Sequence, residues 1–239
     1  MKLGIMQPYF LPYVGYWQLL NEVDSYVVYD DVNYIKGGWI NRNRILVNGK
    51  VNYLTLELQG ASPNKLINEI GLSSNNKSRI KLVKTISQAY KKAPMYDKVF
   101  PLIEEILLFK NNNLGTFVFN SIDAIAKYLD IDTKLYLSSE ISKDNSLKGQ
   151  DKVINICKQL NADTYINAIG GQKLYSFSDF RSEGIVLRFL KTCEDICYPQ
   201  LTSDFCPSLS ILDMLMMLPA EDVKLYLKKF TLIDGDENA

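Results

Sequence analysis

The chain has 239 residues, with 27 lysine and arginine residues balanced by 27 aspartate and glutamate residues, and it contains no histidine. The balanced charge excludes a general attraction to nucleic acid or to a membrane surface. The missing histidine excludes Ser-His-Asp and Cys-His catalysis and histidine-ligated metal sites. Because no apolar run reaches membrane-spanning length and no N-terminal targeting segment is evident, we expect a cytoplasmic protein with one α/β domain over residues 1–239.

The first 30 residues predict a strand, a loop, a helix and a second strand. Residues 3–6 form a short apolar run that stops at Pro8, because proline restricts Gln7 before it to extended geometry. From Val14 onward apolar residues recur at helical spacing, and residues 25–30 form a second apolar run. This order is typical of a doubly wound α/β domain with a mostly parallel sheet, whose ligands bind at the carboxyl ends of the strands.

The rest of the chain predicts a β-hairpin, added helices and a return to the α/β pattern. Asn48-Gly49 favours a type I′ turn between strands at 40–47 and 51–58. A helical insertion near 77–129 contains expected helices at 77–91, 96–110 and 114–129, and Ile80 is expected on the inward face of the first. The next expected elements are a strand at 133–138, helix at 149–161, strand at 162–169, helix at 177–183 and last strand at 185–190. A C-terminal helical pair near 209–229 precedes an acidic tail after Ile233 that we expect to fray.

The loop after the first predicted strand is a candidate binding site. Pro12-Tyr13-Val14-Gly15-Tyr16 is similar to the P-x-H-x-G-H loop of nucleotidylyltransferase-like folds, with tyrosine at both histidine positions. Gly15 would let a phosphate approach the helix N-terminus, whereas tyrosine donates a hydrogen bond without bringing positive charge. Nucleotide or sugar binding therefore fits better than phosphate transfer, and the alternative is that Tyr13, Tyr16 and Trp17 are core aromatics. The candidate binding residues of this loop are Gln7, Pro8, Tyr9, Tyr13, Gly15 and Tyr16.

Asp30 and Asp31 follow the second predicted strand and are candidate catalytic residues. Adjacent carboxylates on an extended chain point to opposite faces, so we expect one of them to enter the site. That carboxylate would act as a base, or would bind magnesium together with substrate phosphates. The alternative is a solvated turn.

Arg42 and Arg44 are the candidate anion-binding pair. On the predicted strand they lie on the same face, and paired guanidinium groups suit carboxylate or phosphate. We take Arg42 as catalytic and expect that alanine in its place abolishes turnover without unfolding the protein. The alternative is a solvated hairpin face with internal salt bridges. The neighbouring binding candidates are Lys36, Trp39, Asn41, Asn43 and Arg44.

Gly170, Gly171 and Lys173 follow a later predicted strand, where glycine N–H groups and a lysine charge would contact a ligand. The cysteines lack the paired spacing of structural zinc sites, so we expect reduced thiols and no metal centre.

Several segments carry a family resemblance. Residues 6–20 read M-Q-P-Y-F-L-P-Y-V-G-Y-W-Q-L-L, followed by Y-D-D-V at 29–32, W-I-N-R-N-R-I at 39–45, Q-A-Y-K-K-A-P-M-Y at 88–96 and C-P-S-L-S-I-L-D-M-L at 206–215. Together they resemble the WbqC-like protein family. The resemblance implies a role in bacterial O-antigen, lipopolysaccharide or other surface polysaccharide biosynthesis, and glycine transfer has been suggested for members.

The expected function is therefore acyl or aminoacyl transfer to, or ligation with, a nucleotide-linked amino sugar. ATP and magnesium are candidate cofactors, by analogy with doubly wound folds that begin with the same strand, loop, helix and strand. The expected partner is the small-molecule nucleotide sugar, with no nucleic acid or membrane, and homo-oligomerisation stays open. The alternative is a non-catalytic protein that binds a nucleotide sugar or another pathway enzyme.

Overall fold

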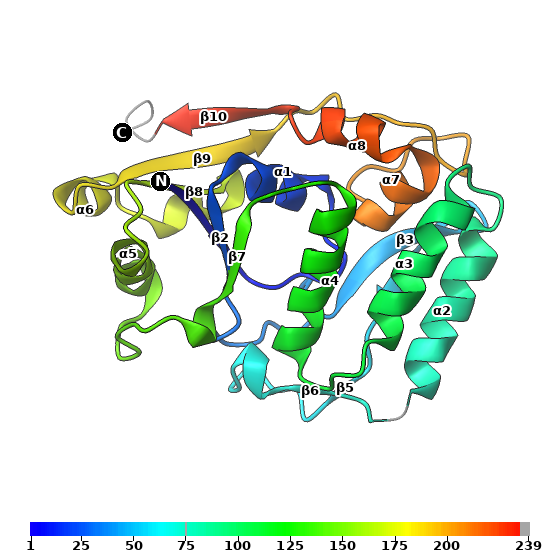
Figure 1. Cartoon of the computed structure of the whole chain (residues 1–239), viewed down its shortest axis with the longest axis horizontal. Helices are drawn as coiled ribbons and strands as arrows, with labels where there is room; N and C mark the ends of the chain where they lie inside the picture. The colour runs from blue at the N-terminus through cyan, green and yellow to red at the C-terminus, as the bar shows by residue number, and fades with distance from the viewer. Residues whose placement is uncertain (75, 235–239) are drawn as a thin grey trace.

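A mostly parallel, six-stranded sheet forms the centre of the computed structural model, which describes residues 1–74 and 76–234 (Figure 1). The strand order is β10-β9-β8-β1-β2-β7, and all neighbours are parallel except β9 and β10. These strands are β1 (Lys2–Met6), β2 (Ser25–Val28), β7 (Lys134–Leu137), β8 (Thr164–Ala168), β9 (Val186–Thr192) and β10 (Phe230–Asp234). The predicted mixed α/β class with a mostly parallel sheet is confirmed.

The chain reverses its direction of winding between β1 and β8. From β1 it proceeds outward to β2 and β7, then returns to add β8 on the other side of β1 and β9 beyond it. Loops that leave the carboxyl ends of two such strands diverge, and ligands of open α/β sheets bind in the resulting crevice. The loop after β1, residues 7–13, starts at this crevice.

Helices cover both faces of the sheet. Successive side chains of a strand point to opposite faces, so they pack into two separate hydrophobic cores. Leu3 and Ile5 pack with α5 and α6, whereas Tyr26 and Val28 pack with the remaining helices. Figure 1 shows α5 and α6 at one end of the molecule and α2, α3 and α7 at the other. The helices are α1 (Val14–Glu22), α2 (Lys77–Tyr90), α3 (Tyr96–Leu108), α4 (Leu114–Tyr128), α5 (Gly149–Gln159), α6 (Phe177–Ser182), α7 (Ile211–Met217) and α8 (Ala220–Tyr226). Among the described residues, none of the helices combines the length and apolarity needed to cross a membrane.

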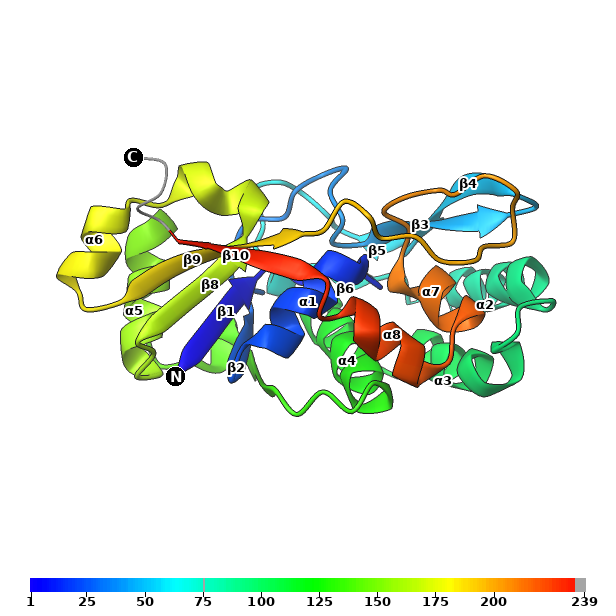
Figure 2. The ribbon, with the colours of Figure 1, turned by 90° about the horizontal axis from the view of Figure 1, so that it is seen from above.

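The predicted hairpin is confirmed. Asn48 and Gly49 have φ values of 51° and 72° and join β3 (Arg42–Val47) to β4 (Lys50–Thr55). The second strand ends at Thr55, three residues earlier than expected, because a separate two-stranded ribbon follows, made of β5 (Leu58–Gln59) and β6 (Gly71–Leu72). The segment between β9 and α7 runs alongside the hairpin (Figure 2), with the Leu201 carbonyl oxygen near Gly49.

Two expectations are wrong. The strand at 185–190 is not the last, since β10 pairs antiparallel with β9 at the sheet edge. Ile80 is 42% exposed, and Arg79 is buried instead because its guanidinium donates to the Phe109 carbonyl oxygen at 2.7 Å. The tail after Ile233 was expected to fray, but Asp234 pairs with Arg188 at the end of β10, and the remaining residues 235–239 lie outside the described residues.

Candidate ligand-binding cleft

The loop after β1 is held by side chains from two distant segments. The Asn43 amide donates to the carbonyl oxygens of Phe10 and Leu11 at 3.1 and 2.9 Å, and the Ser210 hydroxyl donates to that of Leu11 at 2.7 Å. Leu11 needs these anchors because its φ of 44° lies in the left-handed region. These hydrogen bonds fix the backbone of the loop that carries the side chains of Tyr9 and Tyr13.

Tyr13 lies directly over Gly15 at the start of α1. A β-carbon built at residue 15 would clash with the hydroxyl oxygen and two ring carbons of Tyr13. Gly15 therefore makes room for the tyrosine ring, and this ring takes the place that the sequence assigned to an approaching phosphate. Pro12 precedes Tyr13, and its carbonyl oxygen accepts hydrogen bonds from the Trp17 indole N–H at 3.1 Å and from the Ile211 N–H at 2.9 Å.

Tyr16 and Trp17 are core aromatics, as the alternative interpretation held. Tyr16 is 2% exposed, its hydroxyl donates to the Gln7 carbonyl oxygen at 3.2 Å, and burial raises its pKa. Tyr13 differs, with 36% of its surface exposed. Pro8 is buried and Gln7 half-buried beneath the loop.

A cleft of about 340 Å³ opens beside Tyr13, at the carboxyl end of β1. It combines residues from the β1 loop, from the turn and strand before the hairpin tip, and from the segment before α7. The residues that line the cleft are Tyr9, Pro12, Tyr13, Trp39, Asn43, Arg44 and Ser208. The structure thus brings together five of the predicted binding residues, and adds Pro12 and Ser208, which sequence reasoning missed as site residues.

Arg44 gives this cleft its positive charge. Its guanidinium donates to the Ser208 carbonyl oxygen at 2.9 Å and lies 5.7 Å from the centre of the Trp39 ring. The Nε atom is buried and has no hydrogen-bond partner within the protein. A buried donor without an acceptor costs free energy, so Arg44 is held in this position by its other contacts, the Ser208 carbonyl oxygen and the Trp39 ring.

Arg42 lies on the same strand face as Arg44, as predicted, but its guanidinium has other partners. It donates to the carbonyl oxygens of Gly37 and Gly38, the latter at 3.2 Å, and lies 4.5 Å from the centre of the Tyr53 ring. Arg42 thus braces the turn before β3 and does not line the cleft.

Two further residues of that segment also lie outside the cleft lining. Asn41 is buried, donates to the Leu56 carbonyl oxygen at 3.0 Å and accepts from the Tyr34 hydroxyl. Lys36 is exposed on the turn. Asn41 therefore positions the start of the hairpin, and neither side chain is placed against Arg44.

Asp30 joins the ends of two neighbouring strands. It is 2% exposed, and its carboxylate accepts from the Ser139 N–H at 2.9 Å and from the Ser139 hydroxyl at 2.6 Å. Ser139 follows β7, so these bonds tie the end of β2 to the end of β7. Both carboxylate oxygens are engaged by the protein itself.

Asp31 forms a buried cluster with Lys143 and Lys152. Both ammonium groups lie 2.9 Å from its Oδ2 atom, and the two lysine side chains are 1% and 10% exposed. Burial alone raises the pKa of Asp31, but Ser138, Lys143 and Lys152 outweigh burial and leave it below its usual value. Two cations beside one carboxylate do not fit a magnesium site, because they already supply the positive charge that the metal would bring.

The glycine pair after β8 lies in a short 3₁₀ helix, η3 (Ile169–Leu174). Gly170 faces open space, while a β-carbon at Gly171 would meet the Asn167 side chain at 3.3 Å. Lys173 is exposed. The strand order places η3 at the same sheet edge as Gln7, but its residues do not line the cleft.

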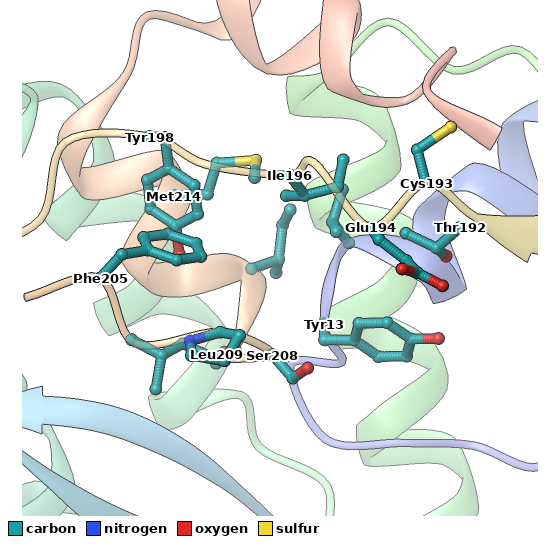
Figure 3. Close-up of a pocket in the computed structure, with 14 residues that line it drawn as sticks. Tyr13, Thr192, Cys193, Glu194, Ile196, Tyr198, Phe205, Ser208, Leu209 and Met214 are labelled. Atoms are coloured by element: carbon teal, nitrogen blue, oxygen red, sulfur yellow. The ribbon is translucent and has the colours of Figure 1, made fainter.

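A second cavity of about 240 Å³ adjoins the cleft and shares Tyr13 and Ser208 with it (Figure 3). Most of its wall comes from the segment after β9 and from the start of α7. The residues that line it are Tyr13, Val14, Thr192, Cys193, Glu194, Ile196, Tyr198, Phe205, Pro207, Ser208, Leu209, Ser210, Ile211 and Met214. Serine is a preferred residue at helix N-termini, and Ser208 and Ser210 precede α7. Ser210 does cap α7, accepting from the Leu212 N–H, but the same hydroxyl also anchors the β1 loop.

The cysteines do not form a metal centre. Cys157 is buried, which raises its pKa to about 12, and Cys193, Cys197 and Cys206 are free thiols. Across residues 1–74 and 76–234, no group of three or more cysteine, aspartate or glutamate side chains is arranged to hold a metal ion.

Comparison with known proteins identifies the family of the chain. The chain is 26% identical over 222 residues to the uncharacterized Mycobacterium tuberculosis protein Rv1507c, covering 92% of this chain and 95% of that protein. No solved structure matches the chain. The model of the WbqC-like protein family matches residues 7–225, which include the β1 loop, the hairpin and the segment before α7. The chain therefore belongs to the WbqC-like protein family.

Proposed function

We propose that the protein binds a nucleotide-linked amino sugar in the cleft and acylates its amino group, as a transferase or an ATP-dependent amide-forming ligase of surface polysaccharide biosynthesis. The supporting observation is that Arg44 and Trp39 lie together in a cleft at the carboxyl end of β1. A guanidinium binds phosphate oxygens, and exposed aromatic faces stack on a base or sugar ring. The ligand class that carries both phosphates and rings is a nucleotide sugar.

Family membership supports the reaction class, because the resemblance implies acyl transfer in sugar modification, with glycine as the suggested group. In this reaction the amino nitrogen of the sugar attacks the carbonyl carbon of an activated acyl group. The new C–N bond forms, the bond from the acyl carbon to its leaving group breaks, and the nitrogen loses one proton.

Glu194 is our candidate acceptor of that proton. Among the described residues that line the cleft or the adjoining cavity, Glu194 alone carries a carboxylate, and Figure 3 shows it at the same end of the cavity as Tyr13. Asp30 and Asp31 then act as positioning residues, because Ser139 and the two buried lysines already engage their carboxylates.

Calorimetric titration tests the ligand class. The purified protein is titrated first with ATP–magnesium and then with UDP-glucosamine. Micromolar binding of ATP would identify a ligase and lead to a pyrophosphate-exchange assay with glycine, whereas binding of the sugar nucleotide alone would identify a transferase with a pre-activated donor. Absence of binding by both compounds would refute the proposal.

Arg44→Gln is the first predicted variant. We expect UDP-glucosamine affinity to fall about ten-fold or more, because a charge-assisted hydrogen bond contributes roughly 1.5–3 kcal/mol. Arg181→Gln is the control, since it removes the same charge from the exposed surface of α6, outside the cleft. Equal losses in the two variants would contradict the assignment of Arg44 to the ligand.

The second candidate function is non-catalytic binding of a nucleotide sugar. It is favoured by the 91% exposure of the Glu194 side chain, because a fully solvated carboxylate is a weak base at neutral pH. The test is to incubate the protein with UDP-glucosamine and an activated acyl donor. Formation of a heavier, acylated sugar nucleotide would show that the protein is an enzyme. Binding without any such product, over a panel of activated donors, would decide for the binding protein.

A further inference from the structure

The cavity beside the cleft, here called the apolar cavity, has polar groups such as Glu194 and Ser208 at the end that adjoins the cleft, and few free hydrogen-bonding side chains elsewhere. The Tyr198 hydroxyl donates to buried Asp213 at 2.9 Å, and the Ser210 hydroxyl donates to the Leu11 carbonyl oxygen at 2.7 Å. Thr192 donates to the Gln18 side chain at 2.7 Å. These lining residues therefore use their polar atoms elsewhere and leave carbon surface toward the cavity.

Aliphatic and thioether side chains form much of the remaining wall. Leu209, Ile211 and Met214 are at most 3% exposed, so they belong to the hydrophobic core and form a rigid boundary. Ile196 is half-buried beside them. In Figure 3 the sulfur of Cys193 points away from Tyr13 and Glu194, so the thiol is not directed at a ligand.

The apolar cavity also adjoins the cleft. Tyr13 and Ser208 line both spaces, so the cleft and the cavity meet at these two residues. Its volume of about 240 Å³ exceeds the roughly 150 Å³ of an engineered apolar cavity that binds benzene. There is room for about six carbon atoms or more.

We propose that the apolar cavity binds the aliphatic chain of the acyl group, so that the transferred group is a straight-chain acyl of about four to eight carbons rather than glycine. This inference rests on the proposed function. Tyr13 and Glu194 lie at one end of the cavity and Tyr198 and Phe205 at the other (Figure 3). The acyl carbonyl then lies at the Tyr13 end, next to the sugar in the cleft, and the chain extends toward Phe205.

A series of product-like compounds tests this. UDP-glucosamine carrying N-linked acyl groups of two, four, six and eight carbons is titrated calorimetrically into the full-length protein. We expect affinity to rise about four-fold per added methylene until the cavity is full, because each buried methylene contributes roughly 0.8 kcal/mol.

Ile196→Phe is the variant that narrows the cavity, and it replaces one half-buried apolar side chain by a larger one. We expect it to remove the gain for the six- and eight-carbon chains while the two-carbon compound binds as before. Ile80→Phe is the matched control, because it makes the same change on the exposed face of α2. The control should keep the chain-length dependence of the wild type.

The outcomes separate this inference from the proposed function. If every compound binds with the same affinity, the acyl assignment is overturned while sugar nucleotide binding stands. If octanoate alone binds and is weakened by Ile196→Phe, but no sugar nucleotide binds, the cavity assignment stands and the proposed function fails. If neither octanoate nor any compound of the series binds, both the cavity assignment and the proposed function are overturned.

Discussion

At the scale of single residues, the contact between Gly15 and Tyr13 determines the shape of the cleft. The tyrosine ring occupies the space where a β-carbon of residue 15 would lie, and Tyr13, which is 36% exposed, lines both the cleft and the adjoining cavity. Because the ring is the free end of a flexible side chain, it can move without disturbing the core. A change at residue 15 is therefore expected to alter binding more than folding.

We predict that Gly15→Ala weakens UDP-glucosamine binding about ten-fold, because it displaces an aromatic ring whose stacking contributes roughly 1–3 kcal/mol. Thermal stability should stay close to that of the wild type, since alanine favours the helix by about 0.5–1 kcal/mol. Calorimetry and thermal unfolding measure the two effects.

The control is the same substitution in a Tyr13→Ala background. Without the ring there is nothing to displace, so Gly15→Ala should leave the remaining affinity unchanged and raise the melting temperature. A further loss of affinity in the double variant would show that the glycine acts by another route, such as direct contact with the ligand.

At the scale of elements, the Asp31 cluster connects three parts of the α/β frame. Asp31 follows β2, Lys143 lies in the loop after β7, and Lys152 is in the first turn of α5. All three charges are buried, so each relies on the others for the solvation that water no longer provides. The carboxylate prevents two buried ammonium groups from facing each other unpaired.

We predict that Asp31→Asn lowers the free energy of unfolding by about 3–5 kcal/mol, the typical cost of breaking a buried ion pair by removing one partner. Urea denaturation measures the loss. The double variant Asp31→Asn with Lys152→Met should be more stable than the single variant, because one uncompensated charge is gone. A single variant as stable as the wild type would contradict the buried cluster.

At the scale of the whole molecule, two buried aspartates give stability opposite dependences on pH. Burial raises the pKa of Asp213 above its ordinary 3.8, although hydrogen bonds from Tyr90 and Tyr198 oppose this. The pKa of Asp31 lies below the same value. The stabilisation from Asp213 is present below pH 3.8 and is lost as the pH rises through the pKa of Asp213 in the folded protein. The stabilisation from Asp31 is present above pH 3.8 and is lost as the pH falls through the pKa of Asp31 in the folded protein.

We predict that Asp213→Asn removes a stability loss that the wild type shows as the pH rises from about 4 toward neutrality. The difference in unfolding free energy, variant minus wild type, should therefore increase with pH over this range. Urea denaturation at several pH values gives the difference. A difference that is flat over this range, or that decreases with pH, would show that the pKa of Asp213 is not raised in the folded protein.

The sequence by itself determined the features that depend on neighbouring residues. Asn48-Gly49 gives the hairpin turn because both residues tolerate positive φ, and the apolar periods give the strands and helices near their observed positions. Residue type and position also singled out Tyr9 and Tyr13 after β1, and Trp39 and Arg44 after β2, which share the cleft. Five-residue β10 was missed because its identity as a strand comes from pairing with β9.

Only the tertiary structure decided which partners these side chains have. Arg42 and Arg44 are equivalent on the strand, yet one braces a turn and the other reaches Ser208, 164 residues further along the chain. Asp31 meets Lys152 over 121 residues, and Ser210 anchors Leu11 over 199. Local propensities carry no information about contacts at such separations, because packing of the finished sheet and helices brings those segments together.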